Sequence, residues 1–140
     1  MKILLAADGS KYTKKALAFL TTHERLCGPD DELVVLQVQV PVPGGVTSMV
    51  GAGVVKSYHR EEAQKVLAPI EAFLARHSLQ ARCIWKVGRI AEEIQKTAAS
   101  EKAHLIVMGT HGHGLLARAV MGSVAQRVVV QSDVPVLLVK

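Results

Sequence analysis

Four residues late in the chain have the types and the spacing that suit phosphate binding. Three glycines and a serine follow the order Gly-x2-Gly-x9-Gly-Ser, at Gly109, Gly112, Gly122 and Ser123. Glycines leave main-chain N–H groups uncovered by side chains, and a helix N-terminus adds unpaired N–H groups and a favourable dipole. We expect a helix to begin at Ser123, because Ser-x-x-Gln forms a capping box. The pattern predicts main-chain amides that bind a phosphate group.

Two better-known glycine patterns fit this stretch poorly. A P-loop needs Gly-x4-Gly-Lys-Ser/Thr, but Gly109-x4-Gly114 is followed by Leu115 and no lysine. The segment 112–117 matches the dinucleotide pattern Gly-x-Gly-x-x-Ala, yet that pattern belongs to the first strand–helix turn of a chain. A plain glycine-rich turn without a ligand remains the alternative.

Asp8 is the acidic residue best placed to join a phosphate site. It directly follows the apolar run 2–7, so a strand would deliver it to a turn. Its carboxylate could accept from ribose hydroxyls or help to hold a divalent ion beside phosphates. The alternative is a turn-former at a helix start, where Asp is common.

Other reactive residues form no recognisable constellation. His104, His111 and His113 are possible metal ligands. Because His111-x-His113 lacks a third well-placed ligand, we expect no dedicated metal site. Cys27 and Cys83 form no CxxC pair, so neither a disulfide framework nor a zinc site is expected. No nucleophile has a base beside it in the sequence, and we name no catalytic residue.

The elements that must position these residues alternate between apolar runs and amphipathic stretches. Such alternation predicts an open five-stranded parallel sheet with helices on both faces, a Rossmann-like α/β fold. The expected strands are 2–7, 33–40, 81–87, 104–108 and 134–140, and the expected helices include 10–26, 55–77 and one that starts at Ser123. The half-polar face of the third strand and Pro135 in the fifth place these two strands at the edges. The order 3-2-1-4-5 satisfies this, and it opens a crevice between strands one and four.

Two segments are expected to be irregular. Prolines and glycines crowd residues 41–53, which we expect to be a long loop without regular structure, either over the ligand mouth or on the surface. Residues 113–121 are too apolar for a fully exposed loop. They are expected to form a short lid turn or to pack on a partner chain.

Composition narrows the class of protein. The chain has 140 residues, a net charge of +5, 49% hydrophobic residues and only 4% aromatic residues. This length suits one domain over 1–140 with an aliphatic core. The basic residues are scattered and lack interleaved aromatics, so we expect no nucleic-acid binding. No apolar run approaches a membrane span or a secretion signal, so we expect a cytoplasmic protein without membrane contact.

The glycine–serine spacing after the fourth strand resembles the ATP-binding signature of the universal stress protein family. The resemblance covers almost the whole chain and includes the strand order. It implies a stress-response sensing or signalling module that binds ATP, with Mg²⁺ or Mn²⁺. It implies that Asp8 borders the nucleotide, that Val38 lines the adenine pocket with its main chain, and that Met108 packs nearby. The implied nucleotide-binding set is Asp8, Val38, Met108, Gly109, Gly112, Gly122, Ser123 and Val124.

The same resemblance implies a homodimer that forms through the last strand, because family members commonly pair there across a two-fold axis. An exposed apolar edge at residues 136–139 tends to be covered in any case. The sequence identifies no protein partner and no particular stress. Two alternatives stay open: a dimeric scaffold of the same fold that binds no nucleotide, and a slow ATP hydrolase or transferase. We expect a weak ATPase at most.

Overall fold

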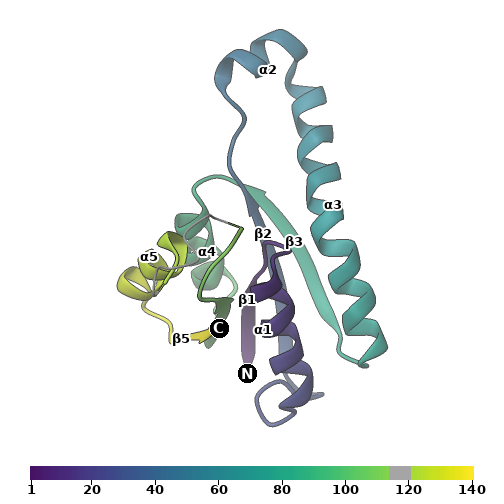
Figure 1. Cartoon of the computed structure of the whole chain (residues 1–140), viewed down its shortest axis with the longest axis vertical. Coiled ribbons are helices and arrows are strands. Elements are labelled where there is room, and N and C mark those ends of the chain that lie inside the picture. Colours follow the sequence, from purple (N-terminus) through teal and green to yellow (C-terminus); the bar gives the residue numbers. More distant parts are fainter. Residues whose placement is uncertain (114–120) are drawn as a thin grey trace.

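One parallel sheet organises the chain (Figure 1). The computed structural model describes residues 1–113 and 121–140. Within those residues the sheet has five strands in the order β3-β2-β1-β4-β5, and all neighbours are parallel. The strands are β1 (Lys2–Ala6), β2 (Glu32–Gln39), β3 (Ala81–Val87), β4 (Leu105–Gly109) and β5 (Val136–Val139). The predicted class and strand order are confirmed, and each predicted strand end lies within two residues of the observed one.

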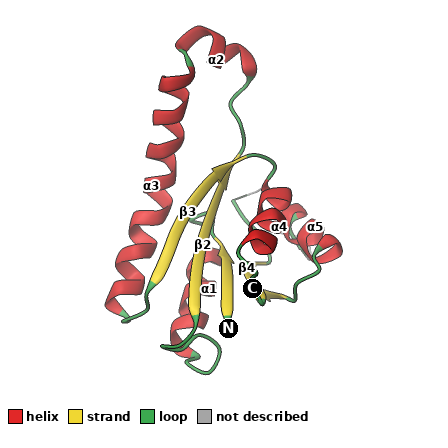
Figure 2. Cartoon of the chain, turned by 180° about the vertical axis from the view of Figure 1, so that it is seen from behind, coloured by secondary structure: helices red, strands yellow, loops and turns green. Residues whose placement is uncertain are grey.

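Helices cover both faces of this sheet, as predicted (Figure 2). The helices of the described residues are α1 (Lys11–Thr22), α2 (Gly44–Val50), α3 (Ala52–Arg76), α4 (Ile90–Ser100) and α5 (Ser123–Gln131). Side chains alternate across the central strand, so Ile3 and Leu5 pack with α1 and α3, whereas Leu4 packs with α4 and α5. Leu4 pairs with β2 and β4 on its two sides and is fully buried. The strand that carries Asp8 is thus fixed at the centre of the core.

The first helix begins as predicted and ends earlier. Ser10 is the N-cap, and its side chain accepts a hydrogen bond from the N–H of Thr13. The expected continuation to Leu26 is wrong, because α1 stops at Thr22. The Thr22 hydroxyl donates to the carbonyl of Ala18 at 2.8 Å. Such side-chain bonds compete with the continuation of the helical ladder.

The expected irregular loop over 41–53 is also wrong. Helix α2 occupies Gly44–Val50, and α3 begins at Ala52. Pro43 is the N-cap of α2, a position where the lack of an N–H costs nothing. Gly51, with φ +88°, makes the turn between the two helices. Pro43 and Gly51 therefore lie at the helix boundaries, whereas Gly44, Gly45 and Gly53 are part of the helices. No residue of α2 is buried, and α2 lies beyond the end of the sheet (Figure 1).

A buried polar contact fastens α3 to β2. The exposed fraction of His59 is 4%. The Nδ1 of His59 and the Oε1 of Gln39 are 2.6 Å apart, and the Nε2 of Gln39 donates to the carbonyl of His59 at 2.6 Å. These two contacts join α3 to the last residue of β2, at the end of the sheet.

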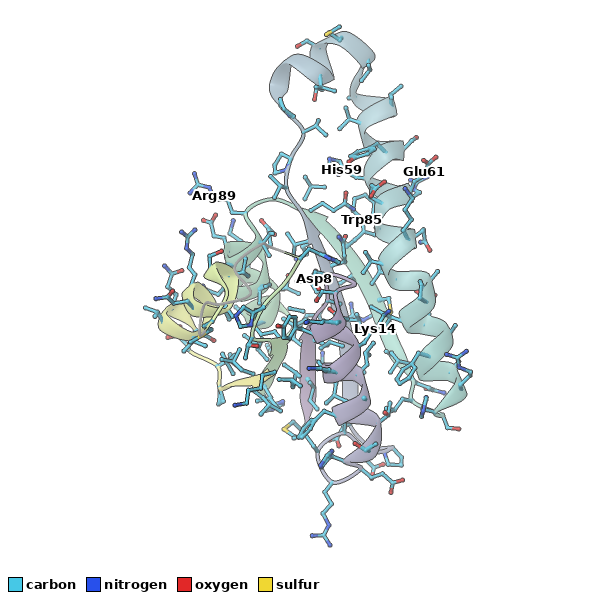
Figure 3. The ribbon with its side chains drawn as sticks, viewed as in Figure 1. Asp8, Lys14, His59, Glu61, Trp85 and Arg89 are labelled. Carbon is cyan, nitrogen blue, oxygen red and sulfur yellow. The ribbon has the colours of Figure 1, made fainter. Side chains whose placement is uncertain are left out.

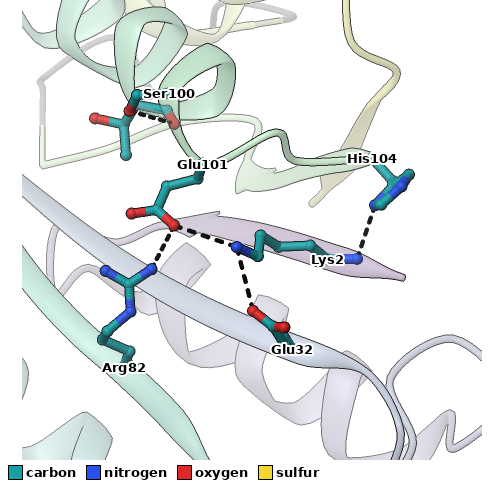
Figure 4. A network of polar contacts seen from close by, with 7 residues as sticks. Lys2, Glu32, Arg82, Ser100, Glu101 and His104 are labelled. Carbon is teal, nitrogen blue, oxygen red and sulfur yellow. Dashed lines mark hydrogen bonds and ion pairs between the residues drawn. The ribbon is translucent and has the colours of Figure 1, made fainter.

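An ionic network joins four elements at the opposite end of the sheet (Figure 4). The Nζ of Lys2 lies 3.2 Å from an oxygen of Glu32 and 3.4 Å from Oε2 of Glu101. Arg82 contacts the same Oε2 of Glu101, which is the C-cap residue of α4. The hydrogen bond from Arg82, followed by its charge, lowers the pKa of Glu101 below the ordinary 4.5. The network therefore links β1, β2 and β3 to the end of α4.

Among the described helices, none is long and apolar enough to cross a membrane.

We expect Glu101→Gln to lower the midpoint of urea unfolding at neutral pH, because the amide has no charge for Lys2 and Arg82. The folded pKa of Glu101 is lowered, so its stabilisation is complete above the unfolded-state pKa and is lost as pH falls through the folded value. The gap between wild type and variant should therefore be smaller in acid, at a pH well below the ordinary 4.5, than at neutral pH. Circular dichroism of urea unfolding measures both gaps.

The matched control is Glu62→Gln, which removes an exposed pair with Lys65 on one helix. Such pairs contribute little, so this variant should unfold like wild type. A gap for Glu101→Gln that is equally large at both pH values would contradict the assignment.

Candidate functional site

A cavity of about 430 Å³ opens at the carboxyl ends of β1, β2 and β4. The chain leaves β1 toward β2 on one side and reaches β4 on the other, and ligands of open α/β sheets bind at such a reversal. The volume is typical of small-molecule sites. The structure brings together the eight residues of the implied nucleotide-binding set, since the lining includes Asp8, Val38, Met108, Gly109, Gly112, Gly122, Ser123 and Val124.

The Asp8 carboxylate is held by the start of α1 (Figure 3). Its Oδ1 accepts from the N–H of Ser10 and from the hydroxyl of Thr13, each at 2.9 Å. The Asp8 N–H donates to the same Thr13 hydroxyl oxygen at 3.0 Å. Within the described residues Oδ2 accepts no hydrogen bond. One oxygen is therefore structural, and the other is available to a ligand.

The loop after β4 meets this turn directly. A Cβ built on Gly112 would lie 2.5 Å from Oδ2 of Asp8, so any side chain there displaces the carboxylate. The Nε2 of His113 donates to the main-chain oxygen of Asp8 at 2.7 Å. The two loops that flank the predicted crevice are thus in contact across 105 positions of sequence.

The expected row of bare amides is only partly present. The N–H of Thr110 donates to the carbonyl of Val139, and the N–H of Gly122 donates to the carbonyl of Thr110. These bonds close the loop onto β5 and onto the start of α5. In the part of the chain that the structure describes, the N–H groups of Gly112, Ser123 and Val124 donate to no protein group. These three amides are among the main-chain donors that remain for an anion.

The predicted capping box at Ser123 is wrong. Helix α5 does begin at Ser123, but its N-cap is Gly122, whose carbonyl accepts from the N–H of Gln126 at 3.0 Å. Gly122 has extended backbone angles, so the capping position falls one residue earlier than the sequence pattern indicates. Ser123 is therefore the first helical residue, and it is exposed. Its hydroxyl is not used to cap the helix.

Val38 and Met108 form part of an apolar wall. Both pack with Ala6 in the cluster that underlies α4 and α5, and Met108 is 6% exposed. Val38 and Met108 therefore pack in the core and also line the cavity. Ile90 and Ile94 of α4 extend the same wall, and the sequence reading did not assign them to the site.

Lys11 and Tyr12 are the lining residues that sequence reasoning missed most plainly. They open α1, three and four residues after Asp8, which is the signal that could have found them. The Tyr12 ring lies 5.1 Å from the ring of His111, and Lys11 Nζ lies 5.3 Å from the Tyr12 centroid. Among the described lining residues, Asp8 carries the negatively charged carboxylate and Lys11 carries the positively charged ammonium group.

The histidines do not converge. The Nδ1 of His104 accepts from the N–H of Lys2 at 2.9 Å, at the amino end of β1 (Figure 4). His111 and His113 line the cavity at the other end. Residues 1–113 and 121–140 hold no group of three side chains suited to a metal ion. Cys27 and Cys83 are free thiols, and burial raises the pKa of Cys83 to about 11. The expected lid at 113–121 lies, apart from its two ends, outside the described residues.

Comparison with known proteins places the whole chain in one group. The model of the Universal stress protein family matches residues 1–140. A universal stress protein of Thermus aquaticus is 37% identical over 138 residues, which cover 99% of this chain and 97% of that protein.

Solved structures agree on the fold. The Methanocaldococcus jannaschii protein MJ0577 superposes with a TM-score of 0.84 at 31% identity, over 99% of this chain and 94% of that one. The universal stress protein of Archaeoglobus fulgidus, solved in complex with dAMP, has a TM-score of 0.69 at 22% identity. That comparison covers 100% of this chain and 98% of that one.

We expect Gly109→Ala to destabilise the protein by about 1–3 kcal/mol, the usual cost of overpacking. A Cβ at this position would fall on the Cβ of Tyr12, closer than real Cβ contacts occur. The free energy of unfolding, measured in urea, tests this. The matched control is Gly45→Ala in α2, where a Cβ meets nothing within 4 Å. The control should be neutral or stabilising, because alanine favours helix by roughly 1 kcal/mol. Equal effects of the two variants would show that β4 does not pack as tightly on α1 as described.

Proposed function

The chain belongs to the universal stress protein family, and from this membership we propose that it binds an adenine nucleotide, ATP with Mg²⁺ or Mn²⁺, in the cavity beside Asp8. The observation that carries the proposal is the convergence of three unused amides and one free carboxylate oxygen on that cavity. We propose a sensing or signalling role in which nucleotide occupancy is the signal.

The phosphates belong at the start of α5. The N–H groups of Ser123 and Val124 are the unpaired amides of a helix N-terminus, where the dipole favours negative charge. Gly112 supplies a further N–H from the facing loop, and the Ser123 hydroxyl supplies a side-chain donor. Lys11 adds a positive charge on the opposite rim. These groups recognise an anion, and we propose binding with at most slow hydrolysis.

The adenine base belongs near Val38. The N–H of Ala7 donates to the carbonyl of Leu36, and the N–H of Gly88 donates to the carbonyl of Gln39. Main-chain groups alternate along a strand, so those of Val38 face the same side as those of Leu36. There β1 has already ended at Ala6. Within the described residues the N–H and C=O of Val38 on this side have no main-chain partner, so they are free to pair with a donor–acceptor edge such as that of adenine.

A divalent ion fits the free oxygen of Asp8. Mg²⁺ commonly takes one or two carboxylates from the protein and completes its shell with phosphates and water. Asp8 is the acid among the described lining residues, so the nucleotide would have to supply the other ligands. The dAMP complex of the Archaeoglobus protein supports the ligand class.

We propose one domain over 1–140 that pairs as a homodimer through the free edge of β5. The carbonyl of Pro135 accepts from the N–H of Ile106 in β4, and that of Val139 accepts from the N–H of Thr110 just after β4, each at 2.9 Å. The main-chain groups of Val136 and Leu138 therefore face away from the sheet, unpaired by β4. The unpaired N–H and C=O groups of such an edge can form hydrogen bonds with a strand of another chain.

Asp8→Asn tests the nucleotide site. The amide keeps an oxygen for Ser10 and Thr13 but has no charge. We expect affinity for ATP with Mg²⁺ to fall roughly tenfold, because the ion loses its carboxylate. Affinity for ATP in EDTA should rise, because the repulsion between carboxylate and phosphate is removed. Isothermal titration calorimetry measures both constants.

Asp133→Asn is the matched control, since Asp133 lies outside the cavity and makes the same charge change. It should leave both constants unchanged. No binding of ATP, ADP or AMP to wild type at millimolar concentration would favour the nucleotide-free scaffold. Steady phosphate release that Asp8→Asn abolishes without loss of binding would favour an enzyme.

Leu138→Pro tests the dimer. Sedimentation equilibrium of wild type should give twice the 15.0 kDa mass of the chain. Proline removes an N–H that points to the free edge, so the variant should sediment as a monomer. Circular dichroism controls for the fold. A folded variant that remains a dimer would place the interface elsewhere.

A further inference from the structure

A second cavity, of about 540 Å³, lies between α1 and α3. It shares Asp8, Thr13 and His113 with the lining of the proposed nucleotide site, but the rest of its lining is its own. Its floor is apolar. Leu17 and Ile70 are each 4% exposed, and both belong to the core. Val66 and Phe73 are partly buried and pack on the same core, and Pro69 completes the α3 side. The groove therefore offers a dry surface to a small apolar body.

The rim of this groove is positively charged. Lys14 comes from α1, and Lys65 and Arg76 come from α3 (Figure 3 labels Lys14). Lys65 is paired with Glu62 at 2.8 Å. In the described part of the chain, neither Lys14 nor Arg76 forms an ion pair. Asp8 is the acid in the lining, and its Oδ1 is engaged within its own turn. Two uncompensated cations thus stand beside an apolar floor.

From this juxtaposition we propose that the α1–α3 groove binds a small amphipathic anion, an aliphatic or aromatic body that carries one carboxylate. The body would pack on Leu17, Val66 and Ile70, and the carboxylate would meet Lys14 and Arg76. Ligand sites are typically apolar with a few placed polar groups. A second copy of this chain suits the groove less well, because a two-fold contact would set the cationic rims against each other.

Octanoate is the probe, and 1-octanol is its uncharged counterpart with the same chain length. In two-dimensional NMR of the full chain, octanoate should shift the signals of Leu17, Val66 and Ile70. It should bind more tightly than 1-octanol, and its affinity should fall with salt. The double variant Lys14→Glu with Arg76→Glu should weaken octanoate binding by roughly tenfold or more, while 1-octanol binding is unchanged.

The matched control, Arg25→Glu with Lys56→Glu, makes the same charge change at exposed residues outside the groove. It should retain octanoate binding. If the first pair fails to fold by circular dichroism, Lys14→Gln with Arg76→Gln replaces it. Any of the following results would overturn the proposal: no shifts in the groove at millimolar octanoate, equal loss in groove and control variants, or equal affinity for octanoate and 1-octanol. Shifts that follow protein concentration alone would also overturn it, in favour of self-association. Because ATP titrations are separate, failure of nucleotide binding leaves this test intact.

Discussion

The close approach of the β4 loop to the beginning of α1 is the constraint on which the cavity depends. A Cβ at Gly109 would fall on Tyr12, and one at Gly112 would fall on the Asp8 carboxylate. A Cβ at Gly122 would lie 3.2 Å from the carbonyl of Thr110. Each glycine of the spacing pattern thus has a packing reason that needs no ligand. The same packing places the loop amides beside a carboxylate, so the shape of the fold and the shape of the site have one cause.

That cause explains what the sequence could and could not predict. Apolar runs identified the strands, and the polar face of β3 and Pro135 marked the two edge strands. The order 3-2-1-4-5 agrees with those edges and is also the order that the family resemblance implies. Because topology brings the ends of β1 and β4 together, the residues at those ends were found with it. The cap of α5 was missed because Gly122, one residue before Ser123, has the backbone angles of the N-cap. Lys11 and Tyr12 were missed because only the packing of α1 on β4 carries them to the cavity.

The charges around the cavity oppose one another. A phosphate there would meet the dipole of α5 and Lys11, which attract it, and the free oxygen of Asp8, which repels it. The turn uses only Oδ1 of this carboxylate, which accepts from both Ser10 and Thr13, so the turn alone does not account for Oδ2. The arrangement favours an anion that arrives with its own counterion.

Helix α2 and the first turns of α3 extend past the sheet. No residue from 44 to 58 is buried, and His59 is the first buried residue of α3. Met49 is 87% exposed, and no residue of α2 is buried. A segment with no core contacts can open locally without loosening the rest. Changes of chain length are therefore tolerated at least cost here, beyond the His59–Gln39 fastening. This projection is the part of the architecture that evolution can lengthen, shorten or replace while the sheet and its crevice stay as they are.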